Sequence, residues 1–234
     1  EFHARLVTPA NGVLAIYGDV HAGAVQGAVE AALGHWTGGT PFPLPAPFPA
    51  APAAREEEAR DKEQAVVVVG YPGTTFTSAD RYALELIQEA CSDLGSRLFL
   101  RIRDELGLAY YVGASNLLGR LPGCFAFYCG TAPGQAAQVE AELKGQAALL
   151  AAEGLTPEEL SRAKAKIIGQ RKIARQDLGQ QALTAALDEL YGLGFAHGDH
   201  DDASFEALTL EDLRAAAHRC FQPDHAVVAI QRGH

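Results

Sequence analysis

Arg103 and Tyr110, seven positions apart, are the residues of this chain whose types and spacing best suggest a chemical function. Arg103 belongs to a predicted helical turn that Gly107 should end. Tyr110 lies where the following strand should begin, so a tight turn would bring both side chains to one rim. A guanidinium and a phenolic hydroxyl placed together can bind a peptide carbonyl and stabilise its oxyanion.

A purely structural role fits the same two residues. A cation near the C-terminal end of a helix is favoured by about 0.3–1 kcal/mol through the helix dipole alone, and tyrosine is common in strands. The spacing of Arg103 and Tyr110 by itself therefore leaves both roles open.

The remaining residues with reactive or metal-binding side chains form no known catalytic pattern. The eight histidines occur in neither His-x-x-Glu-His nor His-Glu-x-x-His. The sequence contains no Gly-x-Ser-x-Gly, no phosphate-binding glycine-rich loop and no Cys-His-Asn signature. The segment 197–202, His-Gly-Asp-His-Asp-Asp, has donor atoms but is typical of a solvated acidic loop. We therefore expect the chain to bind no metal and to be inactive alone.

The composition is that of a folded, acidic protein. Hydrophobic residues make up 48% of the chain and charged residues 21%, which is ordinary for a globular protein. Nineteen basic and twenty-nine acidic residues give a net charge of −10, which disfavours binding to nucleic acid or anionic membranes. No apolar run approaches the roughly 20 residues that span a bilayer, so we expect a soluble protein. The four cysteines are too scattered for a disulfide framework and are expected to be free thiols.

Proline and charge divide the chain into three predicted parts. Six of the twelve prolines fall between Pro41 and Pro52, where missing backbone donors and a fixed φ exclude a helix or an inner strand. Together with the charged stretch from Arg55 to Glu63, they predict a Pro-rich and charged linker over residues 38–63. Residues 1–37 precede this linker and residues 64–234 follow it.

Residues 64–234 carry patterns typical of both strands and helices. The run 65–69, Ala-Val-Val-Val-Val, predicts a strand buried on both faces. Thr156-Pro157-Glu158-Glu159 predicts a helix start with a capping box and proline in the first turn. The predicted helices cover about 79–94, 98–106, 135–153, 156–174, 178–193 and 210–221, and the further strands cover 109–118, 124–131 and 226–230.

This order of elements predicts an α+β fold with a mostly antiparallel sheet covered by helices, because strands and helices do not alternate one for one. Before the linker, residues 13–17 predict a strand and residues 24–36 an Ala-rich helix. The segment 11–17 also resembles the last predicted strand and its approach, 224–230. We therefore expect residues 1–37 to be the βα tail of a preceding homologous domain, and residues 64–234 to be the C-terminal domain.

The segment around Arg103 resembles the second half of the inverted-zincin metallopeptidases. This is the pitrilysin/insulinase family, which includes the mitochondrial processing peptidase and insulin-degrading enzyme. The similarity runs from about Asn11 to Ile230, and an arginine followed seven residues later by a tyrosine is its most specific part. The matching segments are Gly18–Val20, Val69–Gly73, Ser96–Phe99, Arg103–Tyr110, Gly130–Pro133 and Gly154–Leu160.

The resemblance implies a metallopeptidase-half fold, similar to that of the processing peptidase, in which two homologous α+β halves close around a peptide. In that family the N-terminal half carries His-x-x-Glu-His and zinc, and the C-terminal half supplies an Arg/Tyr pair that positions substrate and helps the oxyanion. Arg103 and Tyr110 match this pair, and Tyr111 is expected to face the other way and pack. Zinc is then expected in the partner half, with none bound by this chain.

The function that follows from the resemblance is that of the substrate-binding C-terminal half of a zinc endopeptidase. A non-catalytic scaffold subunit, similar to the core proteins of respiratory complexes, is the alternative, and the intact Arg103/Tyr110 pair favours the first. The expected partners are an N-terminal half or subunit bearing His-x-x-Glu-His and a peptide substrate. An isolated half could also self-associate through the surface that normally meets its partner. The sequence does not distinguish a covalently attached zinc half from a separate one, or a bacterial cytoplasmic from a periplasmic location.

Overall fold

The computed structural model describes residues 1–233. Its contacts divide the chain into two compact units. One unit consists of residues 1–46 and 169–203, and the other of residues 47–168 together with the chain from Ser204 onward. The second unit contains the sheet and the predicted functional residues.

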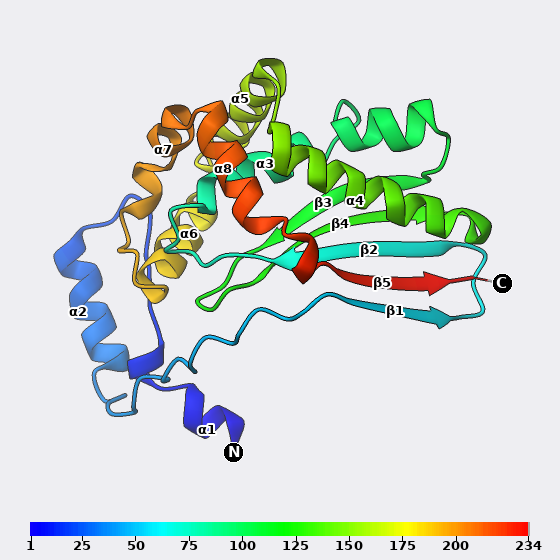
Figure 1. Ribbon diagram of the computed structural model, residues 1–234. Coiled ribbons are helices and arrows are strands. Elements are labelled where there is room, and N and C mark those ends of the chain that lie inside the picture. The colour runs from blue at the N-terminus through cyan, green and yellow to red at the C-terminus, as the bar shows by residue number, and fades with distance from the viewer. Residues whose placement is uncertain (234) are drawn as a thin grey trace. The chain divides into compact units, whose positions relative to one another are not determined.

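The sheet has five strands in the order β1-β5-β2-β4-β3 (Figure 1). The strands are β1 (Ala54–Ala59), β2 (Ala65–Pro72), β3 (Tyr111–Leu117), β4 (Cys124–Thr131) and β5 (Val227–Arg232). Neighbouring strands pair antiparallel, except that β1 pairs parallel to β5. The predicted α+β fold with a mostly antiparallel sheet is therefore confirmed.

Helices cover one face of this sheet. In the sheet unit, α3, α4 and α8 lie over that face (Figure 1). The helices of the chain are α1 (Phe2–Leu6), α2 (Ala22–Leu33), α3 (Arg81–Ala90), α4 (Ala136–Glu153), α5 (Pro157–Ala174), α6 (Leu178–Leu190), α7 (Asp201–Ala207) and α8 (Leu210–Cys220). Single 3₁₀ turns cover Pro9–Asn11, Pro133–Gln135, His197–Asp199 and Pro223–His225, and a π-helix, η2, covers Phe99–Glu105.

The core lies between the sheet and these helices. Along β2, alternate residues from Ala65 to Tyr71 are buried and the residues between them are half-buried. Phe125 and Phe127 of β4 face the same core and are fully buried. The prediction of a strand buried on both faces was therefore wrong, because only one face of β2 is covered by helices. The other face of the sheet, called here the open face, carries half-exposed and exposed side chains.

The strand predicted at 13–17 does not form. These residues have no regular secondary structure and pair with no strand among residues 1–233, and Leu14 and Ile16 are 60% and 45% exposed. A strand is defined by hydrogen bonds to a neighbour, so a strand-like pattern cannot form one alone. The helix that follows is confirmed as α2, since a helix bonds within itself; none of its residues is buried.

A strand forms instead inside the predicted linker. Residues 54–59, Ala-Arg-Glu-Glu-Glu-Ala, are exposed throughout, as their charge indicates, yet they form β1 at the edge of the sheet. The sequence did not predict this strand because its pairing with β5 is made by the main chain and buries no apolar side chain.

The segment 197–202 is not the solvated loop that its composition indicates. Asp201 begins α7, is 1% exposed and pairs with Arg171. Basic residues of α5 also pair with other elements: Lys166, for example, contacts Glu89 and Asp93. The helix predicted over 79–94 ends earlier, since α3 ends at Ala90, and Leu94 beyond it is 74% exposed.

The four cysteines are free, as predicted. Burial raises the pKa of Cys91, Cys129 and Cys220 to about 12, so these thiols are protonated and unreactive near neutral pH. No helix within residues 1–233 is long and apolar enough to cross a membrane.

Candidate functional site

Arg103 is positioned by a π-helix and the turn that ends it. The amide of Leu106 bonds to the carbonyl of Arg101, five residues earlier, so η2 is wider than an α-helix. Gly107 then adopts φ +64°, a left-handed conformation that glycine accepts without steric cost, as predicted for the residue that ends this helix. Short π-helical segments occur frequently at functional sites. The helical spacing of the apolar residues predicted a helix but not its π-type hydrogen bonds.

The guanidinium of Arg103 has two contacts that fix its place. Its Nη1 donates to the main-chain carbonyl of Tyr110 at 3.0 Å, and its Cζ lies 4.8 Å from the ring centroid of Phe99, within cation–π range. A guanidinium has five N–H donors, and this hydrogen bond is the one that the Arg103 side chain makes within residues 1–233. Because Arg103 is exposed, its remaining donors are available to a ligand.

Tyr110 is held by its main chain and presents its ring to solvent. Its amide donates to the carbonyl of Gly130 on β4 at 2.8 Å. The buried hydroxyl of Thr131 donates to the carbonyl of Leu108 at 2.6 Å, which ties the same turn to β4. The Tyr110 side chain is 54% exposed, and its hydroxyl makes no hydrogen bond within residues 1–233. The structure thus brings Arg103 to Tyr110 through the main-chain carbonyl of Tyr110.

Tyr111 lies on the open face of the sheet and packs there. Its ring covers Gly130, where any Cβ would overlap it, and in the mirrored arrangement Tyr128 covers Gly113 on β3. The centroids of the two tyrosine rings are 6.3 Å apart. Two aromatic side chains, each opposite a glycine on the neighbouring strand, therefore form one surface. Tyr128 was not predicted from the sequence, although an aromatic residue paired with a glycine across a hairpin is a signal that could have revealed it.

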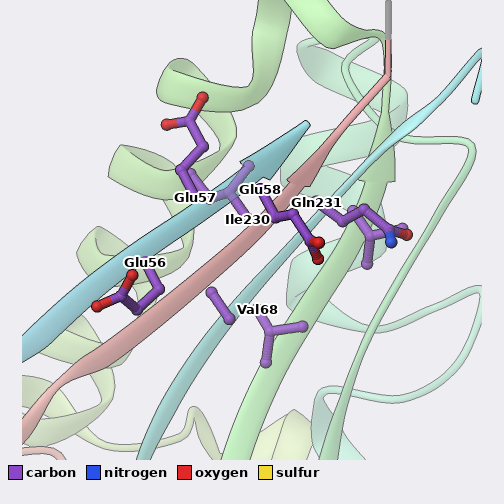
Figure 2. A pocket seen from close by; sticks show the side chains of 8 residues that line it. Glu56, Glu57, Glu58, Val68, Ile230 and Gln231 are labelled. Atoms are coloured by element: carbon purple, nitrogen blue, oxygen red, sulfur yellow. The ribbon is translucent and has the colours of Figure 1, made fainter. Parts of the chain in front are cut away.

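A groove of about 580 Å³ lies farther along the sheet, among residues of β1, β2 and β5 (Figure 2). Side chains alternate along β1, so Glu56 and Glu58 share a side of the sheet, and Glu57 lies on the opposite side. Glu57 pairs there with Arg232 at 2.7 Å. The groove residues are Glu56, Glu57, Glu58, Val66, Val68, Ala229, Ile230 and Gln231. The apolar side chains and the acidic residues together suit an extended peptide with basic side chains.

The described residues offer no metal centre. Within residues 1–233, no three or more His, Cys, Asp or Glu side chains are grouped so that they could hold a metal ion. The site consists instead of hydrogen-bond donors, aromatic rings and carboxylates.

The sequence matches the family model described as "Peptidase M16 inactive domain" over residues 1–167. An uncharacterized zinc protease of Streptomyces coelicolor is 30% identical over 159 residues, covering 68% of this chain and 35% of that protein. An uncharacterized zinc protease of Rickettsia bellii is 32% identical over 125 residues, covering 53% of this chain and 30% of that protein. The chain thus spans about a third of the length of these curated relatives.

Solved structures show the same fold. A peptidase M16 inactive domain from Pseudomonas fluorescens superposes with a TM-score of 0.85 at 17% identity, covering 93% of this chain and 52% of that chain. A protease from Helicobacter pylori superposes with a TM-score of 0.82 at 19% identity, covering 92% and 53%. The family match extends over more than two thirds of the sequence and includes both Arg103 and Tyr110. The chain belongs to the peptidase M16 inactive-domain family.

Proposed function

We propose that this domain is the substrate-binding half of a zinc endopeptidase, in which Arg103 and Tyr110 act on the bound peptide. The observation that carries the proposal is the placement of Arg103. Its guanidinium is fixed by the main-chain carbonyl of Tyr110 and the ring of Phe99, yet most of its donors are uncommitted and exposed, and the Tyr110 side chain is exposed as well. The zinc-protease names of the relatives support the class of reaction.

The chemistry of this pair would be electrostatic. A peptide carbonyl oxygen gains negative charge when it is attacked, and donors held in place beforehand stabilise that charge without having to reorganise. The guanidinium of Arg103 supplies a positive charge and further N–H donors, and Tyr110 supplies a neutral O–H donor. Because the described residues form no metal site, zinc would be held by another half, and this chain's part is to bind and orient the peptide.

We also propose that residues 1–37 are the βα tail of a preceding homologous domain. Apolar side chains at 13–17 are exposed and their main chain is unpaired, which suits a segment that adds a strand to another sheet. The curated relatives and the two solved chains are two to three times as long as the matched part of this chain, which leaves room for such a domain.

The alternative is a scaffold subunit without a role in chemistry. One observation favours it: the contacts of Arg103 with Tyr110 and Phe99 are internal, and a structural arginine that ends a helix would make the same contacts. The exposed donors of Arg103 and Tyr110 contact the peptide under the first function and contact no substrate under the second. Measuring peptide turnover distinguishes the two functions.

The test is peptide hydrolysis by the assembled enzyme carrying Arg103→Ala or Tyr110→Phe. We expect each variant to lower turnover by about 10- to 1,000-fold, the range typical of losing one oxyanion donor, with an unchanged melting temperature. Arg120→Ala and Tyr111→Phe are matched controls that should keep wild-type turnover. Wild-type turnover in both Arg103→Ala and Tyr110→Phe would reject the proposal and favour the scaffold.

A further inference from the structure

A second cavity lies on the helix-covered side of the sheet, away from the residues proposed to act on peptide. Its volume is about 630 Å³, within the range of roughly 300–1,000 Å³ typical of small-molecule sites. The walls come from the start of β1, from β2, from α4 and from the chain between α8 and β5. The residues that matter here are Ala53, Tyr71, Lys144, Gly145, Ala148 and Phe221.

Small residues create this space. Gly145 stands in the middle of the 18-residue helix α4, where glycine costs about 1 kcal/mol relative to alanine. A Cβ built on Gly145 would meet no atom within 4 Å, so the position is not a glycine for lack of room. Ala148, one turn further on, also has a small side chain, and both residues line the cavity together with Phe221.

Tyr71 gives the pocket a polar group. It is 5% exposed, and its ring packs edge-on against Phe221 with centroids 5.3 Å apart. Burial, and then the nearby Cys220, raise the pKa of Tyr71 to about 12, so its hydroxyl is neutral. That hydroxyl has no hydrogen-bond partner within residues 1–233. The hydroxyl can therefore donate a hydrogen bond to a ligand that enters the pocket.

Cations outnumber anions beside the pocket. Lys144 Nζ lies 2.7 Å and Arg55 Nε 3.0 Å from the carboxylate of Glu140. Arg55 also pairs with Glu57, which pairs with Arg232. Of the side chains that line the pocket, the charged ones are the cations Arg55 and Lys144, although the whole chain has a net charge of −10. Lys144 has Glu140 as its carboxylate partner and keeps a 42% exposed side chain, so it is the cation best placed to accept a further anion.

We propose that this pocket binds a small amphipathic carboxylate, with its apolar body between α4 and Phe221 and its charged group at Lys144. The apolar walls favour a hydrocarbon chain or ring, and the excess of cations selects an anion over a neutral or cationic ligand. Tyr71 contributes a hydrogen bond from inside the pocket. This site is separate from the residues proposed to act on peptide, so neither proposal depends on the other.

The test is a titration of the full chain with decanoate in which calorimetry measures the binding. Decanol serves as the neutral probe. We expect saturable binding of decanoate and at least about tenfold weaker binding to Gly145→Phe, because the new ring fills the pocket. Gln138→Phe, two turns earlier on α4 and outside the pocket, is the matched control and should bind as the wild type does. Lys144→Gln should weaken decanoate by about fivefold and leave decanol unchanged.

Each other result overturns part or all of the proposal. Absence of saturable binding by the wild type, or equal binding by Gly145→Phe and Gln138→Phe, would reject the site. Equal affinity of the wild type for decanol and decanoate would reject the assignment of a carboxylate. Gly145→Leu is the second variant, and circular dichroism establishes that each variant is folded before it is titrated.

Discussion

Two segments of the chain carry nearly the same pattern and have different structures. Residues 224–230, Asp-His-Ala-Val-Val-Ala-Ile, lead into β5, which pairs with β1 on one side and β2 on the other. In residues 11–17, Asn-Gly-Val-Leu-Ala-Ile-Tyr, Asn11 ends a 3₁₀ turn, and the residues after it have no regular secondary structure and pair with no strand among residues 1–233. Ile230 is 3% exposed, whereas Ile16 is 45% exposed.

The difference shows that these residue patterns define a tendency to be extended, while a neighbour decides whether a strand forms. β5 lies between two strands that accept and donate its main-chain hydrogen bonds. Segment 11–17 has the apolar residues of a strand but has no such neighbour within the part of the chain that the structure describes, residues 1–233. The free energy of unfolding of this chain by itself should therefore depend strongly on the side chains of β5 and weakly on those of segment 11–17.

The largest loss of stability should come from truncating Ile230, and the same truncation of Ile16 provides the comparison. Ile230→Ala removes buried methyl groups and should lower the free energy of unfolding by about 2–5 kcal/mol. Ile16→Ala changes a half-exposed, unpaired side chain and should change it by less than about 0.5 kcal/mol. Urea unfolding followed by circular dichroism measures both.

A large loss in Ile16→Ala would contradict the comparison, since it would mean that segment 11–17 is packed in the chain alone. The same substitution can also be made in this chain joined to a preceding domain, and its effect there can be compared with its effect in the chain by itself. If residues 1–37 complete another sheet, Ile16→Ala should then become costly.

An intermediate loss of stability should come from breaking the ion pair between Arg97 and Glu159, whose side chains are 15% and 11% exposed. Arg97 Nε lies 2.8 Å from Glu159 Oε1, and its Nη2 lies 2.5 Å from Oε2. Burial alone would raise the pKa of Glu159. The hydrogen bonds from Arg97 and the Thr156 amide, with the charges of Arg97 and Arg162, outweigh burial and lower that pKa below 4.5.

A carboxylate with a lowered pKa stabilises the folded state above its unfolded pKa and loses this contribution as pH falls through the folded value. Glu159→Gln should therefore cost about 1–3 kcal/mol at neutral pH, and the cost should shrink as the pH falls below 4.5. Glu158→Gln, one residue earlier and exposed, is the control and should have little effect at any pH. Urea unfolding at several pH values measures this, and a pH-independent cost in Glu159→Gln would reject the explanation.

The smallest loss of stability should come from substituting residues at the starts of two helices, α5 and α2. At the start of α5, Thr156 and Glu159 form the predicted capping box, with Thr156 Oγ1 accepting from the Glu159 amide at 3.2 Å. Thr156→Ala should cost about 1 kcal/mol and Thr156→Ser only a few tenths. His21 precedes α2 without any side-chain cap, so His21→Ala should be neutral in thermal unfolding. An equal loss from His21→Ala and Thr156→Ala would show that the cap is not what stabilises α5.

Local patterns determined much of this protein in advance. The capping box at Thr156, the glycine turn at Gly107 and the hairpin 109–131 depend on residues close in sequence, and the structure has all three. The family resemblance pointed to Arg103 and Tyr110 for the same reason, because the helix, turn and strand that place them are contiguous. Their chemical role remains a prediction.

Tertiary structure decided what depends on distant partners. The edge strand β1 exists because β5 offers its main chain, whereas segment 13–17 pairs with no strand among the described residues 1–233. Asp201 is buried because Arg171 neutralises it, and Lys166 turns to Glu89 rather than along its own helix. In each case the free energy of a local pattern is small, and a hydrogen bond or ion pair between residues far apart in sequence selects the structure.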